Sequence, residues 1–396
     1  MNREDFPIFS SGLIYLDNGA TTMKPKCVVD EINKYYLEYT ANAHRGDYHN
    51  SVIVDTKYES VREKVKNFIN AESTKEIVFT LGTTDSLNMI TQGFMKHYLK
   101  ENDEVLITES EHASNFLPWI ELSKEIGIKV KFIELVNNKV TIDKVKEAIT
   151  NNTKVISIAG VTNVLGDVRP IHEIGALCKE KGIIFVVDGA QSVPHIKTDV
   201  INDNIDFLAF SSHKMLGPTG VGVLYGKYEL LKELHPVRVG GGMNSYFEKD
   251  LSYEYYDLPT RLEAGTQNIA GVIGFGAAID YLSNIGMDKI RSHELELKEY
   301  FIEKSKELDN IEIYNEDLES GTVAFNIKDI FSQDLAVYLD KHNIAVRAGN
   351  HCAKVLKEVI GVKNTCRISF YLYNTKEDVD KVIEALKNPN IKREII

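Results

Sequence analysis

The stretch IDFLAFSSHKMLGPTGVGVLY, residues 205–225, decides the fold and places a lysine at its centre. Ile205–Phe210 is apolar apart from Asp206, which predicts a short buried strand. Polar residues ending in Lys214 follow, and a turn rich in glycine and proline leads to a second strand at Val221–Tyr225. Most lysines are solvated surface amines. An amine held where apolar strands end loses water, so its pKa falls and it can react with an aldehyde.

Two upstream segments supply what an aldehyde cofactor such as pyridoxal phosphate would need. The apolar run Ile183–Val187 ends in Asp188, which puts a carboxylate at the end of a predicted parallel strand, where ligands bind in open α/β sheets. A second predicted strand, Ile77–Thr80, leads through a glycine and hydroxyl residues into a helix. The unpaired amides of such a helix start suit a phosphate. We therefore expect a pyridoxal phosphate site around Lys214.

Strands and helices alternate along most of the chain, which predicts a mostly parallel sheet with helices on both faces. Predicted strands lie at Leu13–Leu16, Ile77–Thr80, Val105–Thr108, Lys129–Ile133, Val155–Ala159 and Ile183–Asp188, and predicted helices run from Pro25, from about Val54 to Ile69, and over Phe116–Ile126, Ile142–Ile149 and Ile171–Lys181. Asn42–Ser51 is polar and aperiodic, which predicts a loop.

The last third of the chain has a different pattern and predicts a smaller α+β domain. Long helical periodicity begins at Ala270, and short strands at Ile311–Tyr314, Thr322–Asn326, Ala345–Arg347 and Cys366–Phe370 then alternate with helices at Asp334–His342 and Lys376–Leu386. We expect residues 14–282 to form the large domain, and residues 1–13 and 283–396 to form the small one.

Composition and charge restrict the class of protein. The 396 residues are 43% hydrophobic and 26% charged, as in ordinary globular proteins. No apolar run reaches membrane length, and the N-terminus does not have a signal-peptide pattern, so we expect a cytoplasmic protein. The net charge of −12 disfavours binding to nucleic acid or to an anionic membrane.

The cysteine pattern indicates free thiols. Cys27, Cys178, Cys352 and Cys366 form no CxxC pair and have no zinc-finger spacing to histidines, so we expect no metal site. By residue type alone, each cysteine is more often a small buried apolar residue than a nucleophile.

Seven motifs, taken together and in order, identify a family. They are GTT at Gly82–Thr84, ESEHASN at Glu109–Asn115, TNVLG at Thr162–Gly166, VDGAQSVPH at Val187–His195, SSHKMLGPTGVG at Ser211–Gly222, EAGTQN at Glu263–Asn268 and VRAGNHCA at Val346–Ala353. The chain resembles the class V aminotransferase family, and within it the cysteine desulfurases of the SufS type, a branch that includes selenocysteine lyases. The resemblance implies fold type I of the pyridoxal-phosphate-dependent transferases.

The resemblance implies a role for four residues around the cofactor ring. Lys214 would bind the aldehyde and afterwards move protons at the substrate α-carbon. Asp188 would pair with the pyridine nitrogen, although a strand-end aspartate can equally be a helix cap. Gln191 would donate to the ring 3-oxygen, and His112 would stack on the ring.

The resemblance also implies the phosphate ligands. Thr83, Ser211 and His213 would bind the phosphate from within one chain. Thr266 would be donated by the neighbouring subunit, which implies a homodimer with composite sites.

Further matches concern the amino acid substrate, L-cysteine. Arg367 resembles the arginine that binds the substrate carboxylate in a fork, a geometry that lysine cannot imitate, and Asn163 resembles its helper. Cys352 matches the nucleophile that takes sulfur from the substrate and leaves alanine. Arg347 and the pair His44–Arg45 lie in matching segments without an assigned role.

Two departures from the family pattern concern partners. After Ala353 the chain reads KVLKEVIGVKNTC, with apolar residues at helical spacing, so the cysteine segment is expected to be short and ordered. In the family such a segment goes with slow unaided turnover and reliance on a sulfur-accepting protein. Met243 and Asn244 also differ from many relatives, which concerns partner contacts and not the chemistry.

Three functions remain open at this point. The first is a cysteine desulfurase that supplies sulfur for iron–sulfur cluster assembly or thiolation. The second is a selenocysteine lyase, a sulfinate-acting lyase or a transaminase of the same family, although transamination needs no thiol such as Cys352. The third is a catalytically silent scaffold, which the presence of Lys214, Asp188, His112 and Arg367 together disfavours.

Overall fold

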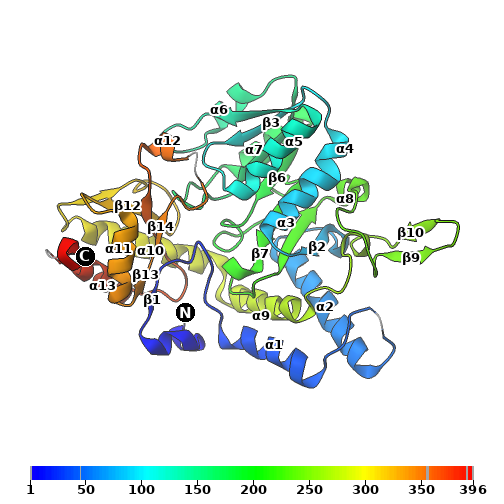
Figure 1. Cartoon of the computed structure of the whole chain (residues 1–396), viewed down its shortest axis with the longest axis horizontal. Coiled ribbons are helices and arrows are strands. Elements are labelled where there is room, and N and C mark those ends of the chain that lie inside the picture. Colours follow the sequence, from blue (N-terminus) through cyan, green and yellow to red (C-terminus); the bar gives the residue numbers. More distant parts are fainter. Residues whose placement is uncertain (1, 45, 354–355, 389–390, 395–396) are drawn as a thin grey trace.

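A seven-stranded sheet forms the centre of the molecule (Figure 1), seen here in a computed structural model that describes residues 2–44, 46–353, 356–388 and 391–394. Its strand order is β2-β8-β7-β6-β5-β3-β4. The strands are β2 (Ile77–Thr80), β3 (Glu104–Thr108), β4 (Lys129–Ile133), β5 (Thr153–Ala159), β6 (Ile184–Asp188), β7 (Phe207–Ser211) and β8 (Gly222–Gly226). Six of these seven strands run in the same direction and β8 runs in the opposite one, so the predicted mostly parallel sheet is confirmed.

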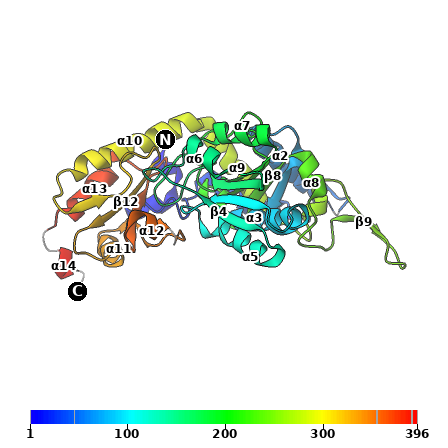
Figure 2. The same cartoon turned by 90° about the horizontal axis from the view of Figure 1, so that it is seen from above.

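Helices cover both faces of this sheet, as Figure 2 shows. One face packs in a large apolar cluster against α1 (Lys26–Glu38), α2 (His49–Phe68), α6 (Ile142–Ala148), α7 (Ile171–Lys181) and α9 (Ile269–Ile285). The other face packs against α3 (Thr83–Asn88), the π-helical stretch Met89–Met95, α5 (Leu117–Ile126) and α8 (Tyr228–Glu233), and α4 (Lys96–Tyr98) continues the π-helical stretch. Strands buried on both faces account for the nearly continuous apolar runs in the sequence.

A second sheet of four strands lies beside the first and has its own apolar cluster. Its order is β11-β12-β15-β14, and all its neighbours are antiparallel. The elements are α10 (Met287–Ser305), β11 (Ile311–Ile313), β12 (Thr322–Ile327), α11 (Ser332–Lys341), β13 (Ile344–Ala345), β14 (Arg347–Gly349), α12 (Leu356–Ile360), β15 (Thr365–Ser369), α13 (Lys376–Leu386) and α14 (Ile391–Glu394). The N-terminal strand β1 (Ile14–Tyr15) pairs with β13.

The structure differs from the predicted elements in three places. Helix α2 begins at His49, inside the predicted loop. Its first turn is polar, which is why the sequence pattern indicates a loop, but Ser51 in that turn is fully buried. The predicted strand Ala345–Arg347 is divided between β13 and β14, which pair with different partners. A projecting hairpin of β9 (Asn244–Phe247) and β10 (Tyr253–Tyr255) was not predicted (Figures 1 and 2).

The described residues contain neither a single membrane-spanning helix nor a cluster of metal-ligating side chains. No single helix in these residues is both long and apolar enough to cross a bilayer. Helices α9 and α10 have the length and apolar composition of a membrane span only when taken together, and they are bent by 76° relative to each other. In the same residues, no three His, Cys, Asp or Glu side chains come together in a possible metal site.

Candidate active site

The ends of five parallel strands meet at one edge of the large sheet and line a cavity of about 240 Å³. Its walls come from the turns after β2, β3, β5, β6 and β7, together with the N-terminal segment and the turn after β14. Of the residues predicted for the site, it brings together Thr83, His112, Asn163, Asp188, Gln191, Ser211, His213, Lys214, Cys352 and Arg367. The edge of a parallel sheet beyond its carboxyl ends is the usual ligand site of such folds.

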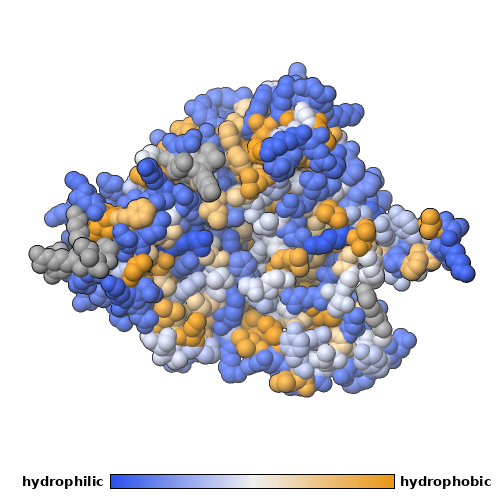
Figure 3. All heavy atoms as spheres, viewed as in Figure 1, coloured by the Kyte–Doolittle hydropathy of each residue, from blue (hydrophilic) through white to orange (hydrophobic). Residues whose placement is uncertain are grey.

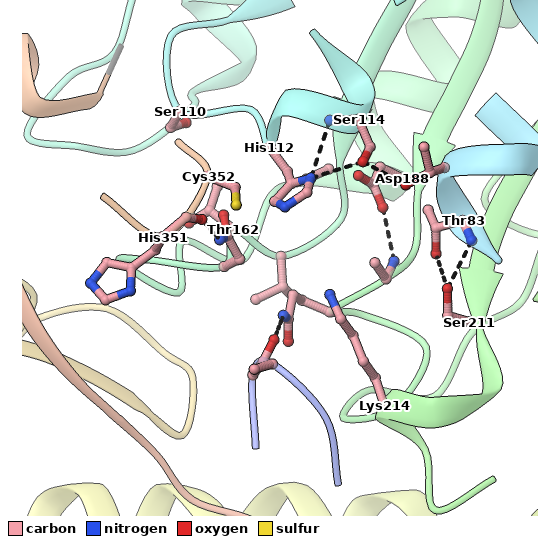
Figure 4. A pocket seen from close by; sticks show the side chains of 18 of the residues that line it. Thr83, Ser110, His112, Ser114, Thr162, Asp188, Ser211, Lys214, His351 and Cys352 are labelled. Carbon is pink, nitrogen blue, oxygen red and sulfur yellow. Dashed lines mark hydrogen bonds between the residues drawn. The ribbon is translucent and has the colours of Figure 1, made fainter. Parts of the chain in front are cut away.

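The amine of Lys214 points into this cavity, toward the centre of Figure 4. Burial lowers its pKa to about 8, and the neighbouring Arg367 and Arg347 act in the same direction. The carboxylate of Asp188 opposes the shift. Near neutral pH a larger fraction of this amine is therefore unprotonated and nucleophilic than of an exposed lysine.

Asp188 ends β6 on the far side of the same cavity and is 3% exposed. Its Oδ1 accepts a hydrogen bond from the Ala190 amide at 3.0 Å. Burial raises the pKa of this carboxyl to about 6, although that amide and the Lys214 cation oppose the rise. A carboxylate with few partners in a buried position would be stabilised by a protonated ring nitrogen.

His112 presents a neutral imidazole to the cavity. Burial lowers its pKa to about 4, and Lys214 acts in the same direction. The Ser114 amide donates to His112 Nδ1 at 3.1 Å, so the proton of the neutral ring resides on Nε2. The side chain also caps the short helix that begins at Ala113. A flat, uncharged ring in a fixed orientation suits stacking on an aromatic cofactor.

Hydroxyl groups gather where β2 and β7 end. Ser211 Oγ accepts from the Thr83 amide at 2.8 Å and lies 2.7 Å from Thr83 Oγ1. A Cβ at Gly222, in β8, would lie 2.4 Å from Gly82 Cα, so glycine at position 222 lets β8 lie this close to the turn after β2. His213 Nδ1 lies 3.2 Å from Thr21 Oγ1. Thr83 lies in the first turn of α3, a short helix, whereas Ser211 ends β7 and His213 follows it.

Gln191 and Arg367 reach the cavity from the other side. Gln191 Nε2 donates to the Gly19 carbonyl at 2.7 Å. Arg367 is 1% exposed, and its guanidinium donates to the Asn163 carbonyl at 2.7 Å and to Asp17 Oδ1 at 2.8 Å. Its Nε has no partner among the described residues, so a donor remains for a ligand.

Cys352 lies at the mouth of the cavity on a turn of unusual backbone geometry. His351 and Cys352 have φ values of 49° and 60°, in the left-handed region that costs non-glycine residues about 1 kcal/mol or more. The turn is held by three contacts. Asn163 Nδ2 donates to the His351 carbonyl at 2.6 Å, the Ala113 amide donates to the Cys352 carbonyl at 2.9 Å, and His351 Nε2 lies 2.9 Å from Thr365 Oγ1.

The contact between Ala113 and Cys352 fixes the thiol next to the loop that carries His112. Figure 4 shows the sulfur directed toward His112, while the imidazole of His351 points away. Cys352 is exposed, whereas Cys178 and Cys366 are buried and burial raises both of their thiol pKa values. Cys352 therefore combines access to solvent with a position in the cavity wall.

Two predicted residues lie elsewhere. Thr266 does not line this cavity and accepts a weak hydrogen bond from Asn42 Nδ2 at 3.4 Å. His44 pairs with Glu59 at 3.2 Å, which raises the pKa of His44, and it lines a separate surface hollow. Arg45 lies outside the described residues. Arg347 does line the cavity.

A buried ion pair beneath the site was not predicted. Arg169 pairs with Glu111 and donates to Thr108 Oγ1 at 2.7 Å and to Ser110 Oγ at 2.6 Å. Glu111 Oε2 in turn accepts from the Ala159 amide at 2.9 Å. The network ties the loop that carries His112 to the end of β5. Glu111 lies inside the ESEHASN motif and Arg169 follows the TNVLG motif, but nothing in the sequence indicates that the two side chains meet.

Comparisons with known proteins match this arrangement over nearly the whole chain. The model of the aminotransferase class-V family matches residues 14–382. The chain belongs to the class V aminotransferase family. A curated relative from Halalkalibacterium halodurans, described as a probable cysteine desulfurase, is 43% identical over 97% of this chain and 94% of its own.

Solved structures of similar proteins show the same fold. The apo cysteine desulfurase of Thermococcus onnurineus has a TM-score of 0.93 and 38% identity, covering 96% of this chain and 95% of its own. The cysteine desulfurase CsdA of Escherichia coli, in an S-sulfonic acid form, has a TM-score of 0.92 and 34% identity, covering 99% and 97%. The fold is type I of the pyridoxal-phosphate-dependent enzymes.

The cavity fits pyridoxal phosphate, the cofactor of this class V aminotransferase. The Lys214 amine of lowered pKa, the Asp188 carboxylate, the neutral His112 ring and the hydroxyls of Thr83 and Ser211 are the groups that the aldehyde, ring nitrogen, ring face and phosphate require.

The raised pKa of Asp188 predicts a cost in stability. Because its pKa in the folded state lies above that of the unfolded state, Asp188 favours folding most at low pH, and this contribution is lost as pH rises through about 6. We expect Asp188→Asn to raise the free energy of unfolding of the cofactor-free protein by about 1–3 kcal/mol near pH 8. The gain should disappear as pH falls toward 4.

Denaturant unfolding of the cofactor-free wild type and variant across this pH range measures the effect. The variant should also bind pyridoxal phosphate more weakly. A less stable variant near pH 8 would show that Asp188 is not strained in the free site.

Proposed function

We propose that this class V aminotransferase is a pyridoxal-phosphate-dependent cysteine desulfurase. It converts L-cysteine to L-alanine and leaves the sulfur as a persulfide on Cys352, for use in iron–sulfur cluster assembly or thiolation. The observation that supports this most strongly is that an exposed thiol lines the same cavity as Lys214 and Arg367. The relatives described as cysteine desulfurases support the same assignment.

Residues that line the cavity then have defined parts in the reaction. Arg367 binds the substrate carboxylate with its remaining donors, and Asn163, whose Oδ1 lacks a partner in the described residues, lies beside it. Lys214 holds pyridoxal phosphate and, when its amine is free, carries protons at the substrate α-carbon. When bound, the cofactor withdraws electrons from the amino acid attached to it.

Cys352 performs the sulfur transfer. Its thiolate attacks the substrate sulfur, so that a sulfur–sulfur bond forms and the bond between Cβ and sulfur breaks. The electron pair of the broken bond stays on the three-carbon fragment, which gains a proton and leaves as L-alanine. One thiol and one L-cysteine thus give one persulfide and one L-alanine, with no external oxidant or reductant.

Cys352→Ala separates this function from other pyridoxal phosphate chemistry. We expect the variant to keep bound cofactor and to give the spectral change on L-cysteine binding, because neither step uses the thiol. Formation of alanine and sulfide from L-cysteine in the presence of a reductant should fall at least about a hundredfold. Mass spectrometry of the wild type after L-cysteine should find one extra sulfur on the peptide that contains Cys352.

Cys366→Ala is the matched control, since it removes a fully buried thiol in a neighbouring strand. Wild-type alanine formation by Cys352→Ala would contradict the persulfide mechanism. Loss of cofactor binding in that variant would instead place Cys352 in the cofactor site.

We also propose that two copies of the chain form the active unit and that Thr266 of one copy binds the cofactor phosphate of the other. Figure 3 shows apolar side chains on the hairpin and along the lower edge near α1. Leu37 on α1 is 83% exposed, and Phe247 and Leu251 in the hairpin are 78% and 86% exposed. Large apolar side chains this accessible indicate an interface.

Mixing two inactive variants tests the shared site. In dimers of Lys214→Ala with Thr266→Ala, one site has its own Lys214 and an intact Thr266 from the other chain. Random exchange of subunits should restore about a quarter of the wild-type sites. The control mixes wild type with the double variant; under sharing its mixed dimers contain no intact site, so only its wild-type dimers are active. Sharing therefore predicts about a quarter of the wild-type sites in both mixtures. No active sites in the first mixture and about half in the control would contradict sharing.

Three finer assignments belong to the same proposal. A sulfur-accepting protein takes the persulfide from Cys352, and a cytoplasmic location keeps that thiol reduced. The cofactor domain spans residues 14–282, and residues 1–13 and 283–396 form the domain that carries Cys352. The 76° bend between α9 and α10 and the separate apolar cluster of the four-stranded sheet support this division.

A further inference from the structure

Two arginines stand directly opposite each other beside the cavity. Arg347 on β14 and Arg367 on β15 are cross-strand partners, and both line the cavity wall. Like charges in directly opposed positions destabilise an antiparallel pair. A negatively charged group near these two side chains, from the protein or from a bound ligand, would therefore reduce the repulsion between the two guanidinium groups.

Asp17 is that anion, and it contacts both arginines. Its Oδ1 accepts from Arg367 Nη2 at 2.8 Å, and its Oδ2 lies 3.8 Å from Arg347 Nη1. Burial lowers the pKa of the Arg367 guanidinium, and Asp17 opposes this shift. One carboxylate thus serves two guanidinium groups, so this end of the cavity retains one uncompensated positive charge.

The backbone around Asp17 fixes the plane of the Arg367 guanidinium. Asp17 forms a parallel bridge with Ser369, and the Gly19 amide donates to Ser369 Oγ at 2.8 Å. A Cβ on Gly19 would lie 2.9 Å from both Cζ and Nη2 of Arg367. Glycine at this position lets the backbone lie against the guanidinium, while Asp17 holds one of its ends.

We propose that Asp17 is a positioning residue that also determines specificity at the carboxylate end of the cavity. It orients Arg367 and neutralises one of the two guanidinium charges, so that the cavity accepts amino acids with one carboxylate and rejects those with a second anionic group in the side chain. The inference rests on the proposed role of Arg367 in binding the substrate carboxylate.

A matched pair of ligands tests it without sulfur chemistry. L-Aspartate is L-alanine with a carboxylate added to its methyl group, so the ratio of their dissociation constants reports how the cavity treats a second negative charge. Titration of the holoenzyme, followed by the absorbance of its bound pyridoxal phosphate, gives both constants. Cofactor content and thermal unfolding are measured on every variant.

Three substitutions change the charge or the geometry separately. Asp17→Asn removes the negative charge and should shift the ratio toward L-aspartate about tenfold or more, while raising the KM for L-cysteine more than it changes kcat. Asp17→Glu keeps the charge, so the ratio should stay within about threefold of wild type even if KM rises. Arg347→Met removes a cation and should shift the ratio in the opposite direction.

Asp206→Asn is the control, because Asp206 is a similarly half-buried carboxylate paired with Lys227 at 2.6 Å on the opposite edge of the sheet. It should leave the ratio unchanged. If Asp17→Asn does not fold, the ratio of dissociation constants measured for Arg347→Met alone tests the inference.

The outcomes separate this inference from the proposed function. An unchanged ratio in Asp17→Asn and Arg347→Met, or equal weakening of both ligands with loss of cofactor or stability, would overturn the specificity role. If the wild-type holoenzyme forms no L-alanine from L-cysteine, the desulfurase assignment fails, whatever the ratio of dissociation constants is.

Discussion

The partial removal of the Lys214 amine from water is the constraint on which the rest of the site depends. An ammonium group that loses part of its water at the edge of a sheet is costly, and here burial lowers its pKa to about 8. Asp188 faces the opposite penalty, since burial raises its pKa. A bound pyridoxal phosphate would offer its aldehyde to the amine and its ring nitrogen to the carboxylate, which would lower both penalties. Lys214 and Asp188 would then both favour binding of the cofactor.

The N-terminal segment holds this strained lysine in place and connects it to the substrate end. The carbonyl of His213, next to Lys214, accepts from the Thr22 amide at 2.9 Å, from Thr22 Oγ1 at 3.1 Å and from Lys24 Nζ at 3.0 Å. A few residues earlier, Asp17 holds Arg367. A short stretch of chain therefore sets the positions of both the cofactor lysine and the carboxylate-binding arginine.

Sequence patterns predicted the elements that depend on local periodicity, and missed contacts between distant segments. The limits of β4, α7 and α13 agree with prediction because apolar spacing and turn residues mark them. Most of the predicted site residues meet in one cavity because parallel strands end at one edge, whereas Thr266 does not line it. The ion pair of Arg169 with Glu111 and the sharing of Asp17 by two arginines depend on strand order, which periodicity does not encode.

Lys214, and no other lysine of the chain, is expected to carry the cofactor. Borohydride reduction of the holoenzyme, followed by proteolysis and mass spectrometry, locates the bound cofactor directly. The account predicts a pyridoxyl phosphate label on the peptide that contains Lys214, and its absence in Lys214→Ala treated in the same way. A label on any other lysine, Lys24 included, would contradict it.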